Sequence, residues 1–180
     1  APVDCGESGS TLRFLIPLAS LTGQEITFVG RGRLMERPQS VYEELYRAKG
    51  LRFEQTPSGL TVEGLLSSGD YTLEGNVSSQ FISGLLFALP LLAGTSTLRL
   101  LPPVESRSYI DMTRAVQAAF GVESRWLDET TLEISGGQEY HPCDYTVEGD
   151  YSQAAFPAVL GAVCGGVTIT GLAPVTLQAD

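Results

Sequence analysis

The sequence is poor in the residues that build metal centres and covalent catalysts. It has one histidine, His141, and three cysteines, Cys5, Cys143 and Cys164, with neither a CxxC pair nor metal-ligand spacing. No serine or cysteine nucleophile motif accompanies His141, which stands before Pro142 in a predicted loop. Cysteines that are few, odd in number and irregularly spaced are typical of reduced thiols in the cytosol. We therefore expect no metal and no cofactor in this chain.

Lysine is nearly absent as well. Lys49 is the only one, and the 180 residues carry a formal net charge of −10 at pH 7. An acidic chain is repelled by nucleic acid and by anionic membranes, so neither is an expected partner. The positive charge is almost entirely arginine, whose planar guanidinium forms paired hydrogen bonds to carboxylate and phosphate groups. Such a composition suits small anionic ligands that are held at defined points.

Long apolar runs and targeting signals are missing too. The longest apolar stretch, residues 81–93, is too short and too interrupted by Ser83, Gly84 and Pro90 to cross a bilayer. The N-terminus has no basic segment, no apolar signal core and no initiator methionine. With 43% hydrophobic residues the chain can nevertheless form a real core. We expect a cytoplasmic protein without a membrane segment, and an internal fragment of a longer chain.

The most informative feature that is present is an internal repeat. A Gly- and Ser-containing segment, an apolar helical stretch, a glycine and a short β-rich run follow one another from Gly6, Gly75 and Gly149, which lie 69 and 74 residues apart. The first two copies continue with an amphipathic helical pattern and two short strands joined by a turn. A strand before each of the later glycines completes a βαβαββ unit. Copies at nearly equal spacing indicate a repeat architecture.

The repeat predicts an α/β (α+β) fold with helices inside and sheets outside. The first helix of each unit is apolar nearly all round and must be buried on most sides, whereas the second has a polar outer face. In the third copy we expect a strand over residues 144–148, a helix, and a strand over residues 167–170. The chain ends shortly after that strand, within the third unit.

Each apolar helix begins in a segment where an anion can bind. The segments contain Ser8–Ser10, Ser78–Gln80 and Ser152–Gln153. Free backbone N–H groups and the positive end of the helix dipole attract phosphate or carboxylate, and serine hydroxyls add donors. The same serines are also suited to capping their own helices. From the residues alone, both interpretations remain open.

Arginines stand close to these helix starts. Arg33 and Arg37 flank Leu-Met-Glu between a strand and a helix, and Arg107 occupies the equivalent place in the second unit. Solvated loop arginines are the alternative interpretation. Arg13 lies one turn inside an apolar helix and therefore needs a carboxylate, backbone or ligand partner. The residues thus indicate a repeat protein that holds small anions, without specifying a reaction.

Five ordered motifs resemble the 5-enolpyruvylshikimate-3-phosphate synthase family. They are residues 4–13 (DCGESGSTLR), 33–38 (RLMERP), 75–81 (GNVSSQF), 105–111 (ESRSYID) and 147–152 (VEGDYS), in family order and over the whole chain. The family fold, two lobes of three βαβαββ units each, agrees with the repeat. The resemblance implies transfer of the enolpyruvyl group from phosphoenolpyruvate to the 5-hydroxyl of shikimate 3-phosphate, in aromatic amino-acid biosynthesis.

The resemblance also implies substrate-binding residues. Three serines would hold the 3-phosphate of shikimate 3-phosphate, a tyrosine would pack against its ring, and a glutamine would lie between both substrates. The implied contacts to shikimate 3-phosphate are Ser78, Ser79, Gln80, Ser106 and Tyr109. Those to phosphoenolpyruvate are Gly9, Arg33 and Gln80, with Arg13 in the same wall.

The resemblance further implies how the chain is divided. Residues 147–150 match the crossover between the lobes, so residues 1–146 would form a substrate-binding lobe that is incomplete at its N-terminus, and residues 147–180 the truncated start of the second lobe. The family's catalytic Asp and Glu lie in segments that are not matched here. We therefore expect no catalytic residue in this chain, no activity from it alone, and a monomeric full-length enzyme.

Two positions depart from the family pattern, and two other functions remain as alternatives. Glu7 stands where asparagine is usual and Phe14 where proline is common, which affects the fine shape of the phosphoenolpyruvate pocket. A UDP-N-acetylglucosamine enolpyruvyl transferase shares the fold and chemistry but would be expected to carry a reactive loop cysteine. A non-catalytic anion-binding module is the other alternative, and the unpaired edge of an incomplete third unit argues against it.

Overall fold

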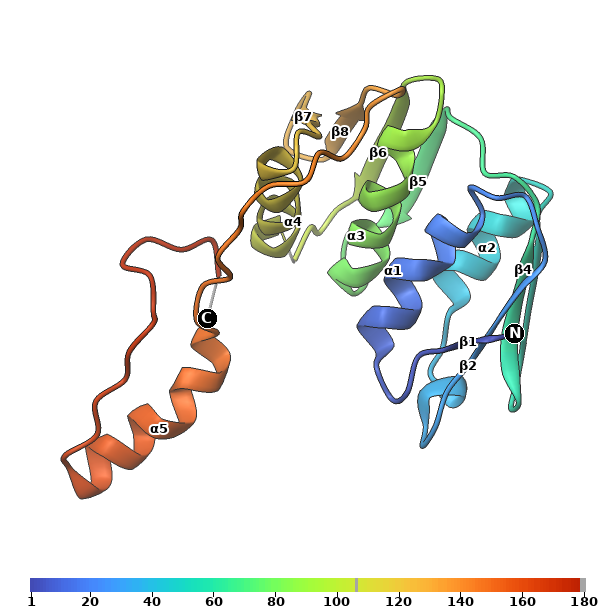
Figure 1. Ribbon diagram of the computed structural model, residues 1–180. Helices are drawn as coiled ribbons and strands as arrows, with labels where there is room; N and C mark the ends of the chain where they lie inside the picture. Colours follow the sequence, from blue (N-terminus) through green and yellow to red (C-terminus); the bar gives the residue numbers. More distant parts are fainter. Residues whose placement is uncertain (106, 179–180) are drawn as a thin grey trace.

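The computed structural model describes residues 1–105 and 107–178, and it contains two four-stranded mixed sheets with helices packed against them (Figure 1). The first unit comprises β1 (Val3–Asp4), α1 (Gly9–Ala19), β2 (Ile26–Val29), a 3-10 turn (Leu34–Glu36), α2 (Ser40–Ala48), β3 (Arg52–Thr56) and β4 (Gly59–Glu63). The second comprises β5 (Asp70–Glu74), α3 (Ser79–Ala88), a 3-10 turn (Leu89–Leu91), β6 (Ser96–Leu101), α4 (Arg107–Ala119), β7 (Arg125–Trp126) and β8 (Thr131–Ile134). A last helix, α5 (Tyr151–Cys164), follows an extended segment. The predicted α/β class is confirmed.

The two sheets have the same topology. Their strand orders are β1-β2-β4-β3 and β5-β6-β8-β7, and in each the first pair is parallel while the others are antiparallel. The parallel pairs arise because α1 and α3 form crossover connections, whereas short turns join the final pairs. Alternate residues of the strands face the core, such as Leu60 and Val62 in β4 and Tyr71 and Leu73 in β5. Each unit therefore buries one face of its sheet.

Helices α1 and α3 pack directly on each other at the centre of the molecule (Figure 1). Seven of the ten residues of α3 are buried, which fits its nearly continuous apolar sequence. Gly84 lies at the closest approach, because a Cβ there would overlap the Tyr42 hydroxyl and the Arg13 carbonyl oxygen. The Tyr42 hydroxyl lies 2.9 Å from the carbonyl oxygens of Arg13 and Phe81, so it bridges the two helices. Burial raises the pKa of Tyr42 well above its ordinary value, which keeps this hydroxyl a donor.

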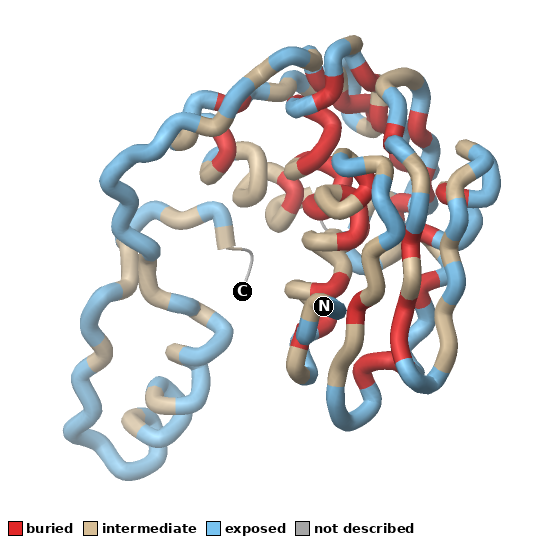
Figure 2. The backbone as a smooth tube through the Cα atoms, turned by 45° about the vertical axis from the view of Figure 1, so that its right-hand side comes forward, coloured by how far each residue is buried: buried red, intermediate tan, exposed pale blue. Residues whose placement is uncertain are grey.

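The third copy of the repeat differs from the prediction. The strands predicted over residues 144–148 and 167–170 are wrong, because both segments lack regular secondary structure. A strand persists only where a neighbouring strand satisfies its backbone groups, and no strand of the described residues pairs with either segment. The helix itself forms, with the Asp150 side chain accepting from the Gln153 N–H at 3.1 Å. None of the α5 residues is buried, and its tube in Figure 2 is pale blue and tan without red.

Among the residues that the structure describes, no helix combines the length and the apolar content that a bilayer crossing requires.

The thiols provide a test of this arrangement. Cys143 and Cys164 are exposed, whereas Cys5 is 5% exposed and its pKa is raised by burial and by the Asp4 carboxylate. Because the thiolate is the reactive form, iodoacetamide should label Cys143 and Cys164 of the folded chain and spare Cys5. Intact-mass spectrometry should then show two additions in buffer and three in concentrated urea. Rapid labelling of Cys5 in buffer would contradict the packing of β1.

Candidate functional site

The first turns of α1 and α3 lie beside each other, and each helix is capped by a serine. The Ser8 hydroxyl accepts from the Thr11 N–H at 3.1 Å, and the Ser78 hydroxyl accepts from the Gln80 N–H at 3.4 Å. The capping interpretation that the sequence left open is therefore realised at both helices. Capping satisfies only part of the donors of a helix start, so the two first turns still present N–H groups and positive dipole ends together.

Gln80 joins the two helix starts. Its amide nitrogen donates to the Ser10 hydroxyl at 2.7 Å, and its amide oxygen accepts from Arg13 Nη1 at 2.9 Å. The Arg13 guanidinium also lies over the Phe81 ring, 4.4 Å from its centre, and its Nε donates to the Gln39 amide oxygen at 3.3 Å. The partners of Arg13 are thus two side-chain amides and an aromatic face, which sequence reasoning did not anticipate.

Gly9, the first residue of α1, brings the backbone close to a second arginine. A Cβ at Gly9 would lie 2.9 Å from Arg37 Nη1 and 4.0 Å from the Gln80 amide oxygen. Arg33, which was predicted to lie here with Gly9, is 87% exposed and pairs with Glu36 at 3.1 Å. Both arginines line a shallow pocket of about 270 Å³. The structure therefore brings Gly9, Gln80 and Arg37 together, and leaves Arg33 at the outer rim.

The loop that carries these arginines is held by glutamine amides. The Gln55 amide donates to the carbonyl oxygens of Met35 at 2.7 Å and Arg37 at 2.9 Å. The Gln39 amide also donates to the Arg37 carbonyl, at 3.4 Å. These bonds fix the backbone of Arg37, so the direction in which its side chain leaves the loop is set by β3 and by the start of α2.

The cluster of Arg13 and Arg37 is electrostatically unbalanced. Burial lowers the pKa of the Arg13 guanidinium, and the positive charge of Arg37 lowers it further. Among the described residues, no carboxylate lies within 4.0 Å of either guanidinium. Two uncompensated guanidiniums at two helix starts can hold an anion, which would relieve their mutual repulsion.

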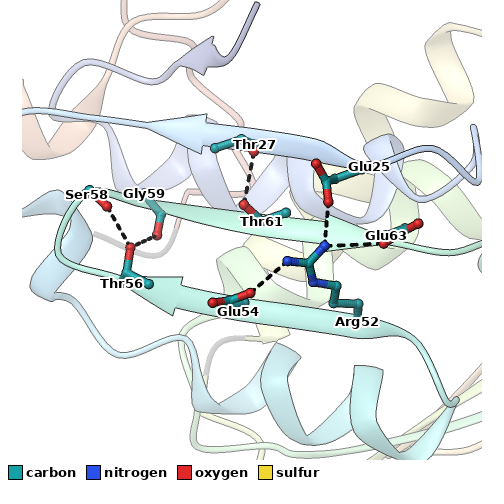
Figure 3. A network of polar contacts seen from close by, with 9 residues as sticks. All are labelled: Glu25, Thr27, Arg52, Glu54, Thr56, Ser58, Gly59, Thr61 and Glu63. Atoms are coloured by element: carbon teal, nitrogen blue, oxygen red, sulfur yellow. Dashed lines mark hydrogen bonds and ion pairs between the residues drawn. The ribbon is translucent and has the colours of Figure 1, made fainter.

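Arg52, in the same unit, shows the contrast. Figure 3 shows Arg52 on the outer face of the first sheet, where its guanidinium bonds to Glu54 at 2.9 Å, to Glu25, and to Glu63 at 3.4 Å. Hydrogen bonds to these carboxylates raise its pKa. Three carboxylates already compensate the positive charge of Arg52, so it is not suited to binding an anionic ligand. Its ion pairs connect neighbouring strands on the surface of the sheet.

In the second unit, Arg107 is likewise held by its own unit. Its guanidinium stacks on the Trp126 ring at 3.8 Å, pairs with Asp111 at 3.6 Å and donates to the Glu129 carbonyl at 2.6 Å. Arg107 is thus not an equivalent of the free arginine beside Gly9. Ser106, a predicted phosphate ligand, lies outside the described residues.

The remaining predicted residues lie on α3 and α4. Ser78 and Ser79 are the cap and first residue of α3. Tyr109 lines a pocket of about 560 Å³ between α4 and the segment before α5, together with Phe120, Tyr145 and Val147. The two residues that depart from the family pattern, Glu7 and Phe14, lie near the cluster but outside it. The Glu7 carboxylate lies against Gly32, where an added Cβ would be 3.1 Å from it. Phe14 packs edge-on against Phe87, with 5.2 Å between the ring centres.

Two contributors were missed by sequence reasoning. Gln39 is 1% exposed at the N-cap of α2, but its side chain does not cap that helix. Tyr42 bridges α1 and α3 from the same helix. The only available signal was the spacing of Tyr42 and Tyr46, which places two large side chains on one face of α2. No local pattern marks Gln39.

Comparison with known proteins points to a single enzyme family. The family model described as EPSP synthase (3-phosphoshikimate 1-carboxyvinyltransferase) matches residues 1–180. A 3-phosphoshikimate 1-carboxyvinyltransferase of Clostridium kluyveri is 48% identical over 181 residues, covering 99% of this chain and 42% of that protein. One from Brachyspira hyodysenteriae is 42% identical over 178 residues, with the same coverage of both chains. The chain thus spans 42% of the length of these curated relatives.

Solved structures agree on the fold. The EPSP synthase of Acinetobacter baumannii superimposes with a TM-score of 0.70 at 23% identity, over 87% of this chain and 35% of that one. At this identity the likeness concerns the fold alone.

Proposed function

Because the chain belongs to the EPSP synthase (3-phosphoshikimate 1-carboxyvinyltransferase) family, we propose that it supplies part of an enzyme that transfers the enolpyruvyl group from phosphoenolpyruvate to the 5-hydroxyl of shikimate 3-phosphate. The observation that carries this proposal is the cluster of Arg13, Arg37, Gly9 and Gln80 at the paired starts of α1 and α3. Both substrates are phosphate-bearing anions, and the cluster has positive charge and donors, with no carboxylate of the described residues within 4.0 Å of the Arg13 and Arg37 guanidiniums.

The substrate contacts follow the two helix starts. For phosphoenolpyruvate the proposed residues are Gly9, Arg33 and Gln80, and Arg37 adds the guanidinium that already lies beside Gly9. For shikimate 3-phosphate they are Ser78, Ser79, Gln80, Ser106 and Tyr109. The position of Gln80 between the two helix starts supports its contact with both ligands. Placing two anions side by side in a fixed orientation lowers the entropic barrier to their reaction.

The contribution of this chain is binding and orientation. Its cluster contains guanidinium, amide and hydroxyl groups, none of which is suited to protonating the enol carbon or removing the proton of the 5-hydroxyl at neutral pH. Because the chain spans 42% of the length of its curated relatives, we assign the proton-transfer groups to the part of the enzyme that it does not span, and we expect no transferase activity from the chain alone. The uncovered helix α5 supports the division into a lobe of residues 1–146 and the start of a second lobe at residue 147.

All three cysteines are free, which supports a reducing compartment such as the cytoplasm.

The proposal is tested by calorimetric titration of the chain with shikimate 3-phosphate, with and without phosphoenolpyruvate. The double variant Ser78→Ala with Ser79→Ala should bind shikimate 3-phosphate about tenfold more weakly or worse, because two hydroxyl donors to the phosphate are lost. Ser58→Ala, in the exposed turn between β3 and β4, is the control and should bind as the parent does. Thermal unfolding of each variant separates lost binding from the lost cap of α3.

Other outcomes would change the assignment. Tighter binding of UDP-N-acetylglucosamine than of shikimate 3-phosphate would favour the related enolpyruvyl transferase. Equal binding of inorganic phosphate and both substrates would favour a non-catalytic anion-binding module. No binding of shikimate 3-phosphate at millimolar concentration would contradict the proposal that this chain holds a functional half of the site.

A further inference from the structure

Gln39 is a buried polar side chain that does not cap its own helix. It is 1% exposed at the N-cap of α2, and its side chain makes no capping bond to that helix. Its amide oxygen accepts from Arg13 Nε at 3.3 Å, and its amide nitrogen donates to the Arg37 carbonyl at 3.4 Å. Burial of an amide is costly unless both ends are bonded, and both bonds of Gln39 lead to arginines of the anion cluster.

Arg13 connects Gln39 to Gln80, because its guanidinium donates to both side-chain amides. A guanidinium has five donors and no acceptor, so an amide that faces it must present its oxygen. Gln39 and Gln80 both do so, through Arg13 Nε and Nη1 respectively. Once the Gln80 oxygen faces Arg13, its NH₂ group must point the opposite way, where it donates to Ser10 and keeps a second N–H.

We propose that Gln39 is a positioning residue of this site: by anchoring Arg13, it keeps the Gln80 amide oxygen bonded to Arg13, so that the remaining N–H of the Gln80 NH₂ group, and not an unbonded oxygen, is available to a bound anion. The identity of that anion rests on the proposed function, whereas the orientation of the amide does not. A Gln80 side chain that was free to flip would present an oxygen to a phosphate or carboxylate for part of the time. That orientation replaces an attraction with a repulsion, so a fixed amide improves affinity and selectivity for anions.

Gln55 provides a matched control. It donates to the same Arg37 carbonyl at 2.9 Å and to the Met35 carbonyl at 2.7 Å, whereas the described side-chain bonds of Arg13 go to Gln39 and Gln80. Replacing either glutamine by leucine removes an amide donor to the arginine loop. Only Gln39→Leu also removes the acceptor that anchors Arg13.

The experiment uses the ¹⁵N-labelled chain and follows the side-chain amide pair of Gln80, assigned by its loss in Gln80→Ala. Without ligand, Gln39→Leu should shift or broaden this pair by several line widths, whereas Gln55→Leu should leave it in place. With phosphoenolpyruvate as the probe, Gln39→Leu should bind about tenfold more weakly. Gln39→Glu keeps an acceptor for Arg13 and should restore the parental Gln80 signal, although its bond to the Arg37 carbonyl is lost.

If Gln39→Leu fails to fold, the proposal can still be tested by a measurement on the unmutated chain. The Arg13 Nε–H should exchange with water much more slowly than that of exposed Arg31, because Gln39 accepts from it. An unchanged Gln80 pair in folded Gln39→Leu, or an Arg13 Nε–H that exchanges as fast as that of Arg31, would overturn the positioning role. These signals are measured without ligand, so they test the positioning role independently of binding. A chain that binds no phosphoenolpyruvate would contradict the proposed function only.

Discussion

Replacing Gly84 with alanine is expected to lower the free energy of unfolding by about 3 kcal/mol, although alanine favours helices over glycine by about 1 kcal/mol. The added methyl group would overlap the Tyr42 hydroxyl and the Arg13 carbonyl oxygen. The carbonyl belongs to α1, so it moves only if the whole helix does. The helices must separate or Tyr42 must leave its bridge, and either change loosens a closely packed centre. Urea denaturation followed by circular dichroism measures the loss.

A double-mutant cycle identifies the cause. Tyr42→Phe removes one of the two overlapping atoms, together with the hydroxyl that lies 2.9 Å from the Arg13 and Phe81 carbonyls. By itself this change should cost about 1–2 kcal/mol, because the carbonyls lose a buried donor. The combined variant should lose less stability than the sum of the two single losses, since neighbouring changes are not additive. Strict additivity, or a Gly84→Ala chain as stable as the parent, would show that α1 and α3 are not packed this closely.

Arg13→Met should weaken phosphoenolpyruvate binding by about 100-fold and lower the free energy of unfolding by about 2 kcal/mol. The variant leaves the Gln39 and Gln80 amide oxygens without their donor and removes a guanidinium from the anion cluster. It also relieves the repulsion between Arg13 and Arg37, which offsets part of the stability loss when no anion is present. Added phosphoenolpyruvate should therefore raise the melting temperature of the parent much more than that of the variant.

The control for this prediction is Arg99→Met, which removes the same charge from an exposed position on β6. It should show the parental response to phosphoenolpyruvate, because only the net charge has changed. If Arg99→Met weakens binding as strongly as Arg13→Met, the effect is long-range and no specific role for Arg13 remains. If Arg13→Met binds as the parent does, Arg13 has no part in the site.

The sequence predicted the order of elements because that order rests on local chemistry. Glycines before and after apolar stretches marked the ends of α1 and α3, and the contrast between apolar and amphipathic helices indicated which would be central. Strand pairing was less predictable, since it depends on partners distant in the chain. Residues 144–148 have the composition of a strand, but no described strand pairs with them. Of the two short strands expected after the amphipathic helix of the second unit, the first is reduced to Arg125–Trp126, which pairs with β8.

The sequence predicted the kind of the candidate site, which stays a prediction, but not the arrangement of its side chains. Serines and glycines at helix starts, with arginines in the following loops, were sufficient to predict an anion site. Whether Arg33 or Arg37 lies beside Gly9 depends on how the loop folds back, and that is set by distant amides such as Gln55. The role of Gln39 depends on contacts with α1 that a sequence pattern does not record.

The bridge made by Tyr42 has a mechanical consequence. One hydroxyl, supplied by α2, fastens α1 to α3, and with Gly84 at the crossing there is no spare volume through which these helices could slide. The two units are therefore stiff with respect to each other and turn as one block. Compliance is concentrated in residues 141–147, where every residue is exposed and no regular structure resists twisting. A force that moved α5 against the rest of the chain would be transmitted through this segment as a hinge, and the anion cluster would be carried along without being deformed.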